Sequence, residues 1–420
     1  MVLYSEPQRA TALGIFPYFT QPDPELNRDS AGRDPLGVLP VWSEVGRGLV
    51  PCLASPVLQA NGIRAVLLIH WIGDLPRFQK LLTSAARMRG FLRLMEGIVE
   101  YWLSVSDRRI CFGSQALAAA GNEFKVTATS GKTVANGLHQ YYRGSCQRAG
   151  LFDSDWAVEG ALGALFEKVW TESATKALAQ ALEPVLERGK LAVDLLLATN
   201  PQIDEAFERV FESTAISAHL CCILGEDRHR ALARTFAELR RQDLKLHERA
   251  ERLASDALSV EIERMHLCEP FLLVLQDTFT ILRASPGLPI SKVAAGIQHC
   301  AESMRQRAAA FVDLEGQVRS PRMRPLQKLA QLLANPGQPA MQVTMEAFMC
   351  ALVAYHRECM EERGRDPMVV LEGDVVVLPG GAERDADFAR ERLITGQPWD
   401  NDYYLNTAAI ICRQLDEGQA

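Results

Sequence analysis

The sequence has no C-x-x-C pair among its ten cysteines, and no other paired spacing typical of a zinc ribbon or a disulfide framework. It has no apolar run of the ~18–20 residues that a membrane helix needs, since stretches such as Ala65–Ile69 are only of core size. The N-terminus lacks a charged region followed by an apolar segment, so no signal peptide is predicted. We therefore expect a cytoplasmic protein with reduced, free thiols and no membrane contact.

Motifs of the common enzyme classes are absent too. Ser130-Gly131-Lys132-Thr133 is similar to the end of a phosphate-binding loop, but the glycine required five residues before the Gly-Lys pair is Val126 here. There is no G-x-S-x-G elbow. We predict no catalytic residue, no metal site and no cofactor. An enzyme whose site has no recognisable motif stays open as an alternative.

Acidic residues outnumber basic ones, and the formal net charge is −7. The balance is uneven along the chain, because residues 1–155 hold 16 Lys/Arg and 13 Asp/Glu, whereas 156–420 hold 29 and 39. A polyanion responds to local positive potential rather than to net charge. The N-terminal part is therefore the better candidate for meeting nucleic acid.

Three windows of the sequence carry basic residues and no acidic ones: Leu75–Met95, Phe124–Phe152 and Gly316–Met345. Each lies where a compact helix-turn-helix or winged-helix unit can be drawn. An Arg-rich helix face is often only solvated, but phosphate contact is the sharper hypothesis. The residues predicted to contact nucleic-acid phosphates are Arg77, Lys80, Arg87, Arg89, Lys132, Arg143, Arg322, Arg324 and Lys328.

The predicted fold is mainly α, with winged-helix-like units at both ends of a helical-bundle middle. We expect four ranges: an extended arm over 1–35, a winged-helix-like domain over 36–155, a helical bundle over 156–315 and a winged-helix-like domain over 316–420. In the second range, an apolar helix is predicted over Ile63–Ile72, an amphipathic one over Phe91–Val105 and a short one over Ser114–Ala120. A strand over Phe124–Thr129 then leads into a helix that ends near Ala149.

A heptad pattern runs from residue 232 to 260, where apolar side chains recur in alternating steps of four and three with Asp243 as a polar interruption. One interpretation is a long helix within an intramolecular bundle. The other is a coiled coil with a partner or with a second copy of the chain. The residues predicted to bind such a partner are Leu232, Phe236, Leu239, Leu246 and Leu253.

Near the C-terminus, two β-branched runs flank Glu372-Gly373-Asp374 within Met368–Leu378, and Pro379 follows. This pattern predicts a β-hairpin. Helices are predicted over Pro325–Leu333 and Thr344–Arg363, with a turn between them, so the order is helix, turn, helix, hairpin. The second helix carries Glu358, Glu361 and Glu362, which disfavours it as a major-groove recognition helix.

Two segments carry a resemblance to known proteins. They are Pro35–Trp71, in which Gly48-Leu49-Val50-Pro51 leads to Arg64-Ala65-Val66-Leu67-Leu68-Ile69-His70-Trp71, and Tyr141-Tyr142-Arg143-Gly144-Ser145-Cys146 before Ala149-Gly150-Leu151-Phe152. Together they resemble the N-terminal pattern of uncharacterised accessory proteins of bacterial phage-defence and mobile-element islands. That resemblance implies a role in a multiprotein complex on DNA. The order of domains is also similar to the kleisin subunits of SMC-type complexes, whose middle is more open.

These observations favour a non-enzymatic, DNA-associated subunit of an anti-phage defence or mobile-element complex. It would contact DNA phosphates without sequence preference, and bind other subunits of the complex or a second copy of itself. The main alternative is a scaffold or kleisin-like bridge that reaches DNA only through its partners.

Overall fold

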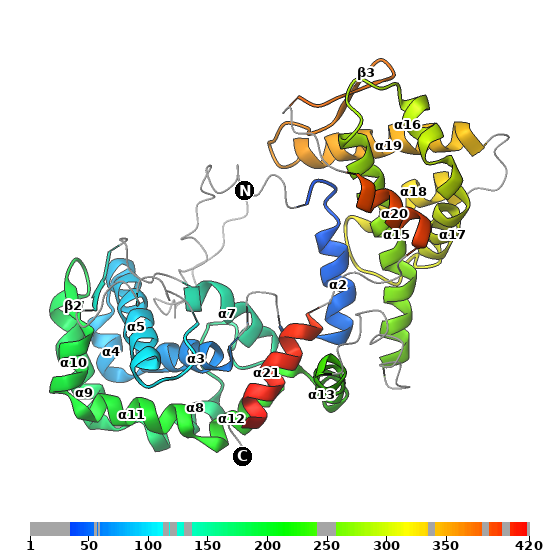
Figure 1. Ribbon diagram of the computed structural model, residues 1–420. Coiled ribbons are helices and arrows are strands. Elements are labelled where there is room, and N and C mark those ends of the chain that lie inside the picture. Colours follow the sequence, from blue (N-terminus) through cyan, green and yellow to red (C-terminus); the bar gives the residue numbers. More distant parts are fainter. Residues whose placement is uncertain are drawn as a thin grey trace. The chain divides into compact units, whose positions relative to one another are not determined.

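A computed structural model of the chain describes residues 34–53, 57, 59–111, 117, 124–129, 137–241, 258–334, 341–379, 386–396 and 404–417. These residues are mainly helical, with 18 α-helices and two small two-stranded antiparallel sheets among them (Figure 1). The predicted fold class is confirmed at this level. The winged-helix-like form of the two ends stays a prediction.

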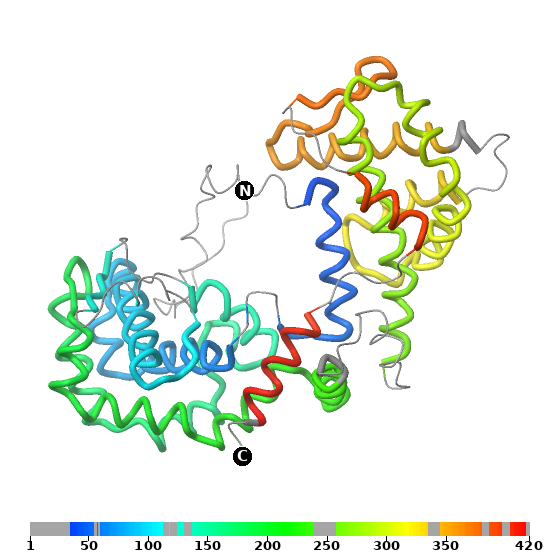
Figure 2. The backbone as a smooth tube through the Cα atoms, in the orientation of Figure 1, coloured from blue at the N-terminus to red at the C-terminus, as the bar shows by residue number. Residues whose placement is uncertain are grey.

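The chain forms two compact units, and each takes residues from distant parts of the sequence. Unit 1 contains Val50–Glu238 and Tyr404–Ala420, and unit 2 contains the stretch that ends at Leu49 and Leu239–Tyr403. In Figure 2 the blue start of the described chain belongs to unit 2, and the red C-terminal helix belongs to unit 1. The range 156–315, predicted as one bundle, is divided between the two units, because its residues up to Glu238 contact unit 1 and those from Leu239 contact unit 2. The four predicted ranges stay a prediction.

Unit 1 holds eleven of the described helices, one of which, α13, runs slightly past its boundary. They are α3 (Ala60–Asp74), α4 (Pro76–Leu81), α5 (Ala85–Val105), α7 (Gly137–Arg148), α8 (Gly160–Val169), α9 (Glu172–Leu182), α10 (Val193–Thr199), α11 (Pro201–Glu212), α12 (Thr214–Leu220), α13 (Asp227–Arg241) and α21 (Leu405–Glu417). Two 3-10 helices, η3 (Glu183–Val185) and η4 (Cys221–Leu224), belong to it as well.

Helix α3 forms the centre of unit 1. A helix that is apolar on every side has to be buried, and from Ile63 to Ile72 every residue except Trp71 is buried. Arg64 is the one cation in this run, and its guanidinium donates to the carbonyl of Phe211 and to the hydroxyl of Ser217. Those two bonds satisfy a charge that would otherwise be costly to bury, and they tie α3 to α11 and α12.

Helix α5 packs against the first small sheet of unit 1. Strand β1 (Lys125–Thr127) pairs antiparallel with β2 (Lys190–Ala192), so the predicted strand at 124–129 is present and its partner lies more than 60 residues later. A Cβ added at Gly97 would lie 2.2 Å from the Val126 side chain, and one at Gly90 would lie 1.7 Å from the Leu186 carbonyl oxygen. Both glycines are therefore required for the close approach of α5 to these segments.

Unit 2 holds the remaining described helices and the second small sheet. They are α2 (Leu39–Leu49), α15 (Ser259–Arg283), α16 (Ile290–Gly296), η6 (Gln298–Cys300), α17 (Ala301–Val312), α18 (Met323–Ala334), α19 (Met341–Glu361), β3 (Val370–Glu372), β4 (Val375–Val377) and α20 (Asp387–Thr395). Helix α15 is the centre of this unit, because α2, α17, α19 and α20 all pack against it.

A buried ion pair joins α20 to α15. The Arg392 guanidinium donates through Nε and Nη2 to both carboxylate oxygens of Asp277, at 2.6–3.1 Å. Only 2% of the Asp277 side chain and 11% of the Arg392 side chain are exposed. Fork-to-fork pairing of this kind fixes geometry as well as charge, so it defines where α20 sits on α15.

The C-terminal hairpin predicted within 368–378 is confirmed. Val370 pairs with Val377 and Glu372 with Val375, and Gly373 in the turn has a φ of 66°, which favours glycine. The Gly287 amide donates to the Val376 carbonyl of β4 and the Ile290 amide to the Asp374 carbonyl of the turn, so the segment before α16 covers one edge of the hairpin. The order α18, α19, hairpin agrees with the sequence. The predicted short helix at 114–120 lies outside the described residues except for residue 117, and so does the predicted arm over 1–35 except for its last two residues.

We predict that Gly97→Ala lowers the free energy of unfolding of unit 1. The clash with Val126 costs roughly 1–3 kcal/mol, more than the gain in helix propensity of about 1 kcal/mol. Gly163→Ala in α8 is the matched control, since its Cβ would meet the Trp71 ring at an ordinary 3.7 Å, and it should stabilise by up to about 1 kcal/mol. Urea unfolding followed by tryptophan fluorescence measures both, because four of the six tryptophans lie in unit 1. Equal stabilisation by the two substitutions would contradict the packing described.

Candidate functional site

In the first basic window, which lies on α4 and α5, two of the arginines form ion pairs with acidic residues of unit 1. Arg77 pairs with Glu172 at 3.7 Å, and Arg87 pairs with Glu187 at 2.8 Å while also donating to the Leu81 carbonyl. Two of the four nominated cations of this window therefore have acidic partners that are remote in sequence. Of the other two, Lys80 is exposed and Arg89 is half-buried.

In the second window, Lys132 lies outside the described residues, and Arg143 faces into unit 1. Its Nη1 donates to Nε2 of His139 at 3.0 Å, and its guanidinium carbon lies 5.2 Å from the centre of the Trp156 ring. A guanidinium can only donate, so Nε2 of His139 must be the acceptor. Arg143 thus has a defined structural role in the fold of unit 1.

Arg143 also fixes which nitrogen carries the proton in a pair formed by the buried His70 and the half-buried His139. Nδ1 of His139 lies 3.0 Å from Nε2 of His70, and because His139 accepts on Nε2, its Nδ1–H is the donor in this contact. Burial lowers the pKa of His70 to about 4 and that of His139 to about 2, and in each case the Arg143 charge adds to the effect. Both rings are therefore neutral at physiological pH. Glu96 fixes the start of α7 by accepting from the His139 amide at 2.8 Å.

The third window, in unit 2, divides into paired and exposed cations. Arg322 is half-buried and forms an ion pair with Glu362, the residue that follows α19. Arg324 and Lys328 are exposed on α18, and neither forms an ion pair with any residue that the structure describes. Positions four apart share one helix face, so these two like charges lie side by side.

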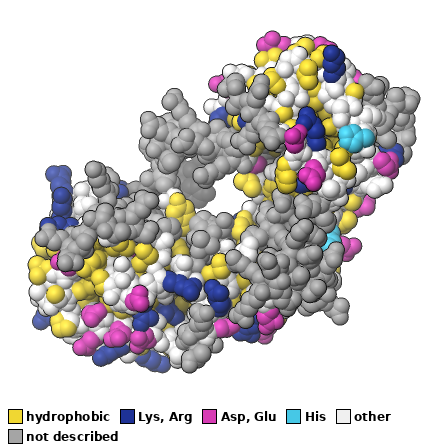
Figure 3. Space-filling view, in the orientation of Figure 1, with side chains coloured by type: hydrophobic (Ala, Val, Ile, Leu, Met, Phe, Trp, Pro, Cys, Tyr) yellow, Lys and Arg dark blue, Asp and Glu magenta, His cyan; other side chains and the backbone are white. Residues whose placement is uncertain are grey.

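On the surface, too, described basic side chains lie close to acidic ones. On the face shown in Figure 3, Lys and Arg side chains lie among Asp and Glu in both units, and no continuous basic surface is seen there. Windows without acids in the sequence are brought close to acids of α9, of the loop after η3 and of the turn after α19 by folding. The exposed pair on α18 is therefore the best-placed part of the predicted phosphate interface.

The heptad pattern is shared between the two units. Leu232 and Phe236 on α13 are buried in unit 1, with 5% and 0% of their surface exposed. Their burial favours the intramolecular interpretation for this part of the pattern. Leu239 lies in α13 without a described side chain, and Leu246 and Leu253 lie outside the described residues.

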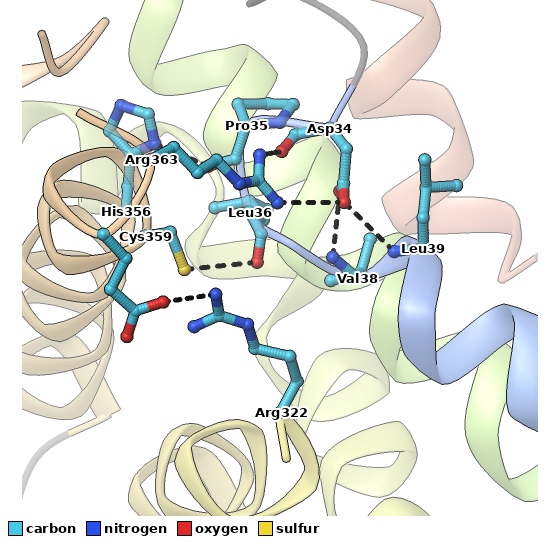
Figure 4. Close-up of polar contacts among 10 residues, drawn as sticks. Asp34, Pro35, Leu36, Val38, Leu39, Arg322, His356, Cys359 and Arg363 are labelled. Carbon is cyan, nitrogen blue, oxygen red and sulfur yellow. Dashed lines mark hydrogen bonds and ion pairs between the residues drawn. The ribbon is translucent and has the colours of Figure 1, made fainter. Parts of the chain in front are cut away.

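Close to α18, a network of hydrogen bonds ties the segment before α2 to α19 (Figure 4). The Asp34 carboxylate accepts from the amides of Val38 and Leu39 and pairs with Arg363. His356 joins this segment to the one before β3: Nδ1 donates to the Pro35 carbonyl at 2.8 Å, and Nε2 accepts from the Met368 amide at 2.9 Å. These bonds position the first turn of α2 beside the segment that leads into α18.

A hollow of about 470 Å³ opens between these two segments of unit 2. Its walls come from Asp34, the first three turns of α2 and residues 319–321. The sequence predicted a basic window on one wall, but nothing in it indicated that α2 would form the other. The two walls are about 280 residues apart in the chain, and a local sequence pattern cannot predict that segments so far apart lie together.

No family model, curated protein sequence or solved structure matches the chain. Among the residues that the structure describes, no helix is both long and apolar enough to cross a membrane. Within the same residues, no three His, Cys, Asp or Glu side chains converge as a metal site would require. Function is therefore inferred from the side chains themselves.

We predict that unit 1 loses stability as the pH falls from about 6.5 to about 4. In that window the unfolded chain binds protons at His70 and His139 and the folded chain does not, so stability is full above pH 6.5 and each of the two histidines lowers it by about 1.4 kcal/mol per pH unit below that. Urea unfolding at a series of pH values, followed by tryptophan fluorescence, measures the decline.

The control for this prediction is His70→Gln, which keeps a polar side chain but cannot titrate. Asp74, whose pKa is raised to about 6 by burial, titrates in the same range with the opposite sign, so the difference between wild type and variant isolates His70. The variant should show a flatter pH profile. An unchanged slope would mean that His70 does not stay neutral in the folded state.

Proposed function

We propose that this chain is a non-enzymatic, DNA-associated subunit that contacts backbone phosphates through α18 of unit 2. The observation that carries the proposal is the exposed pair Arg324 and Lys328, which share one face of α18 and have no ion-pair partner among the described residues. Two like charges four residues apart destabilise an isolated helix slightly, and a phosphate backbone would remove that repulsion.

The internal partners of the other nominated cations narrow the interface. Arg77, Arg87 and Arg322 each pair with a carboxylate, and Arg143 donates to His139. A phosphate that approached these side chains would have to compete with bonds already made. Phosphate contacts of this kind position a protein on DNA without reading its sequence, in accord with the expected lack of sequence preference.

The wider role, in an anti-phage defence or mobile-element complex, rests on the sequence resemblance. In that role unit 2 would hold the DNA, while other subunits of the complex would provide the chemistry. A scaffold that binds only proteins is the competing function, and the binding experiment below separates the two.

We predict that the double substitution Arg324→Gln and Lys328→Gln weakens binding to a random DNA duplex. The plot of the logarithm of the binding constant against the logarithm of the salt concentration should become less steep by about 2, since each lost phosphate contact removes about 1. The matched control is Arg77→Gln with Arg87→Gln, which removes the same charge from side chains already paired within unit 1. Fluorescence anisotropy from low salt to about 200 mM measures all three proteins, with circular dichroism as a check on folding.

The control pair should bind like the wild type. Equal weakening by both pairs would show that net charge, and not α18, determines binding. Absence of wild-type binding at low salt would remove direct DNA contact and leave the scaffold function in first place.

A further inference from the structure

The hollow beside α2 has the size and the walls of a small-molecule site. Its volume of about 470 Å³ lies within the roughly 300–1,000 Å³ typical of ligand pockets. One wall carries Leu39 and Pro40, and the opposite wall carries Pro321 and Arg319. Leu39 keeps 46% of its surface exposed, so an apolar surface is left uncovered there.

Two acids and two arginines line the hollow, and one of these arginines is left without an acidic partner because Arg363, from outside the lining, pairs with Asp34. Asp34 is satisfied by two backbone amides and by Arg363, which approaches it from the turn after α19 (Figure 4). Glu44 pairs with Arg47 one turn further along α2, at 3.7 Å. Arg319 is exposed and forms no ion pair with any described residue.

A hydroxyl lies next to that free cation. Ser320 lines the same wall, and its Oγ accepts from the Arg322 amide at 3.3 Å. Because a serine hydroxyl can accept and donate at once, its hydrogen can still be donated into the hollow. A guanidinium and an adjacent hydroxyl form a donor set that suits one carboxylate or phosphate group.

We propose that this hollow binds a small organic anion with one anionic group and an apolar body. The anionic group accepts from Arg319 and Ser320, and the apolar body lies against Leu39, Pro40 and Pro321. The hollow is separate from the exposed face of Arg324 and Lys328, so this inference does not depend on DNA binding.

The first test is isothermal titration calorimetry of the full chain with four probes that separate the two parts of the ligand. Phenylacetate carries both the charge and the ring, phenylacetamide lacks the charge, acetate lacks the ring, and phenyl phosphate replaces the carboxylate by a phosphate group. At least one of the two aromatic anions should bind ten times more tightly than phenylacetamide and acetate, which corresponds to about 1.4 kcal/mol. Which of the two binds better identifies the preferred anionic group.

The second test uses pairs of variants. Arg319→Gln should weaken binding of the preferred anion at least tenfold, and Arg324→Gln, an exposed arginine outside the hollow, should leave it unchanged. Leu39→Ser should weaken the aromatic anions, while Leu332→Ser, at a similarly exposed leucine of α18, should not.

Three results would overturn the proposal: no binding of either aromatic anion, equal binding of phenylacetamide, or equal effects of Arg319→Gln and Arg324→Gln. Failure here is distinguishable from failure of DNA binding, because the DNA variants leave Arg319 intact and the anion probes do not require Lys328.

Discussion

Each unit of this protein is completed by one helix that is separated from the rest of its unit, in the sequence, by the residues of the other unit. Helix α2 precedes every described residue of unit 1 in the chain, yet it buries Val41, Val45 and Leu49 in unit 2 against α15. Helix α21 follows all of unit 2, yet it packs on α3 and α12 of unit 1, where Gln414 accepts from the Ala60 amide at 2.6 Å. Apolar helices in isolation are marginal in water, so these long-range closures are what complete the two cores.

This interleaving explains which features the sequence could predict. The mainly helical class, the buried helix at 63–72 and the hairpin around Gly373 all depend on local periodicity or on a single turn, and all three are present. The partner of β1 and the second wall of the hollow depend on residues about 60 and 280 positions away. A single sequence without an alignment holds no record of such pairings, so contiguous ranges were the natural expectation.

The ion pairs at the candidate site could not be predicted from the sequence either. The acid-free windows suggested free cations, but Glu172, Glu187 and Glu362 are brought to three of the arginines by folding. Exposed ion pairs of this kind contribute little to stability, yet they occupy the donors that a phosphate would need. Arg324 and Lys328 differ from these three arginines in having no acidic partner in the part of the chain that the structure describes, and from the exposed Lys80 in forming a pair on one helix face. Local composition identified the basic residues, but only the folded structure shows which of them are paired with acids.

Hydrogen exchange with mass spectrometry tests the proposed contact between α18 and DNA. Amide exchange would be compared with and without a random duplex at low salt, with peptides that cover α18, α4, α5 and α7. Contact through α18 predicts slower exchange in residues 319–334 and no change in the helices that carry Arg77, Arg87 and Arg143. Protection confined to those helices, or found nowhere, would contradict it.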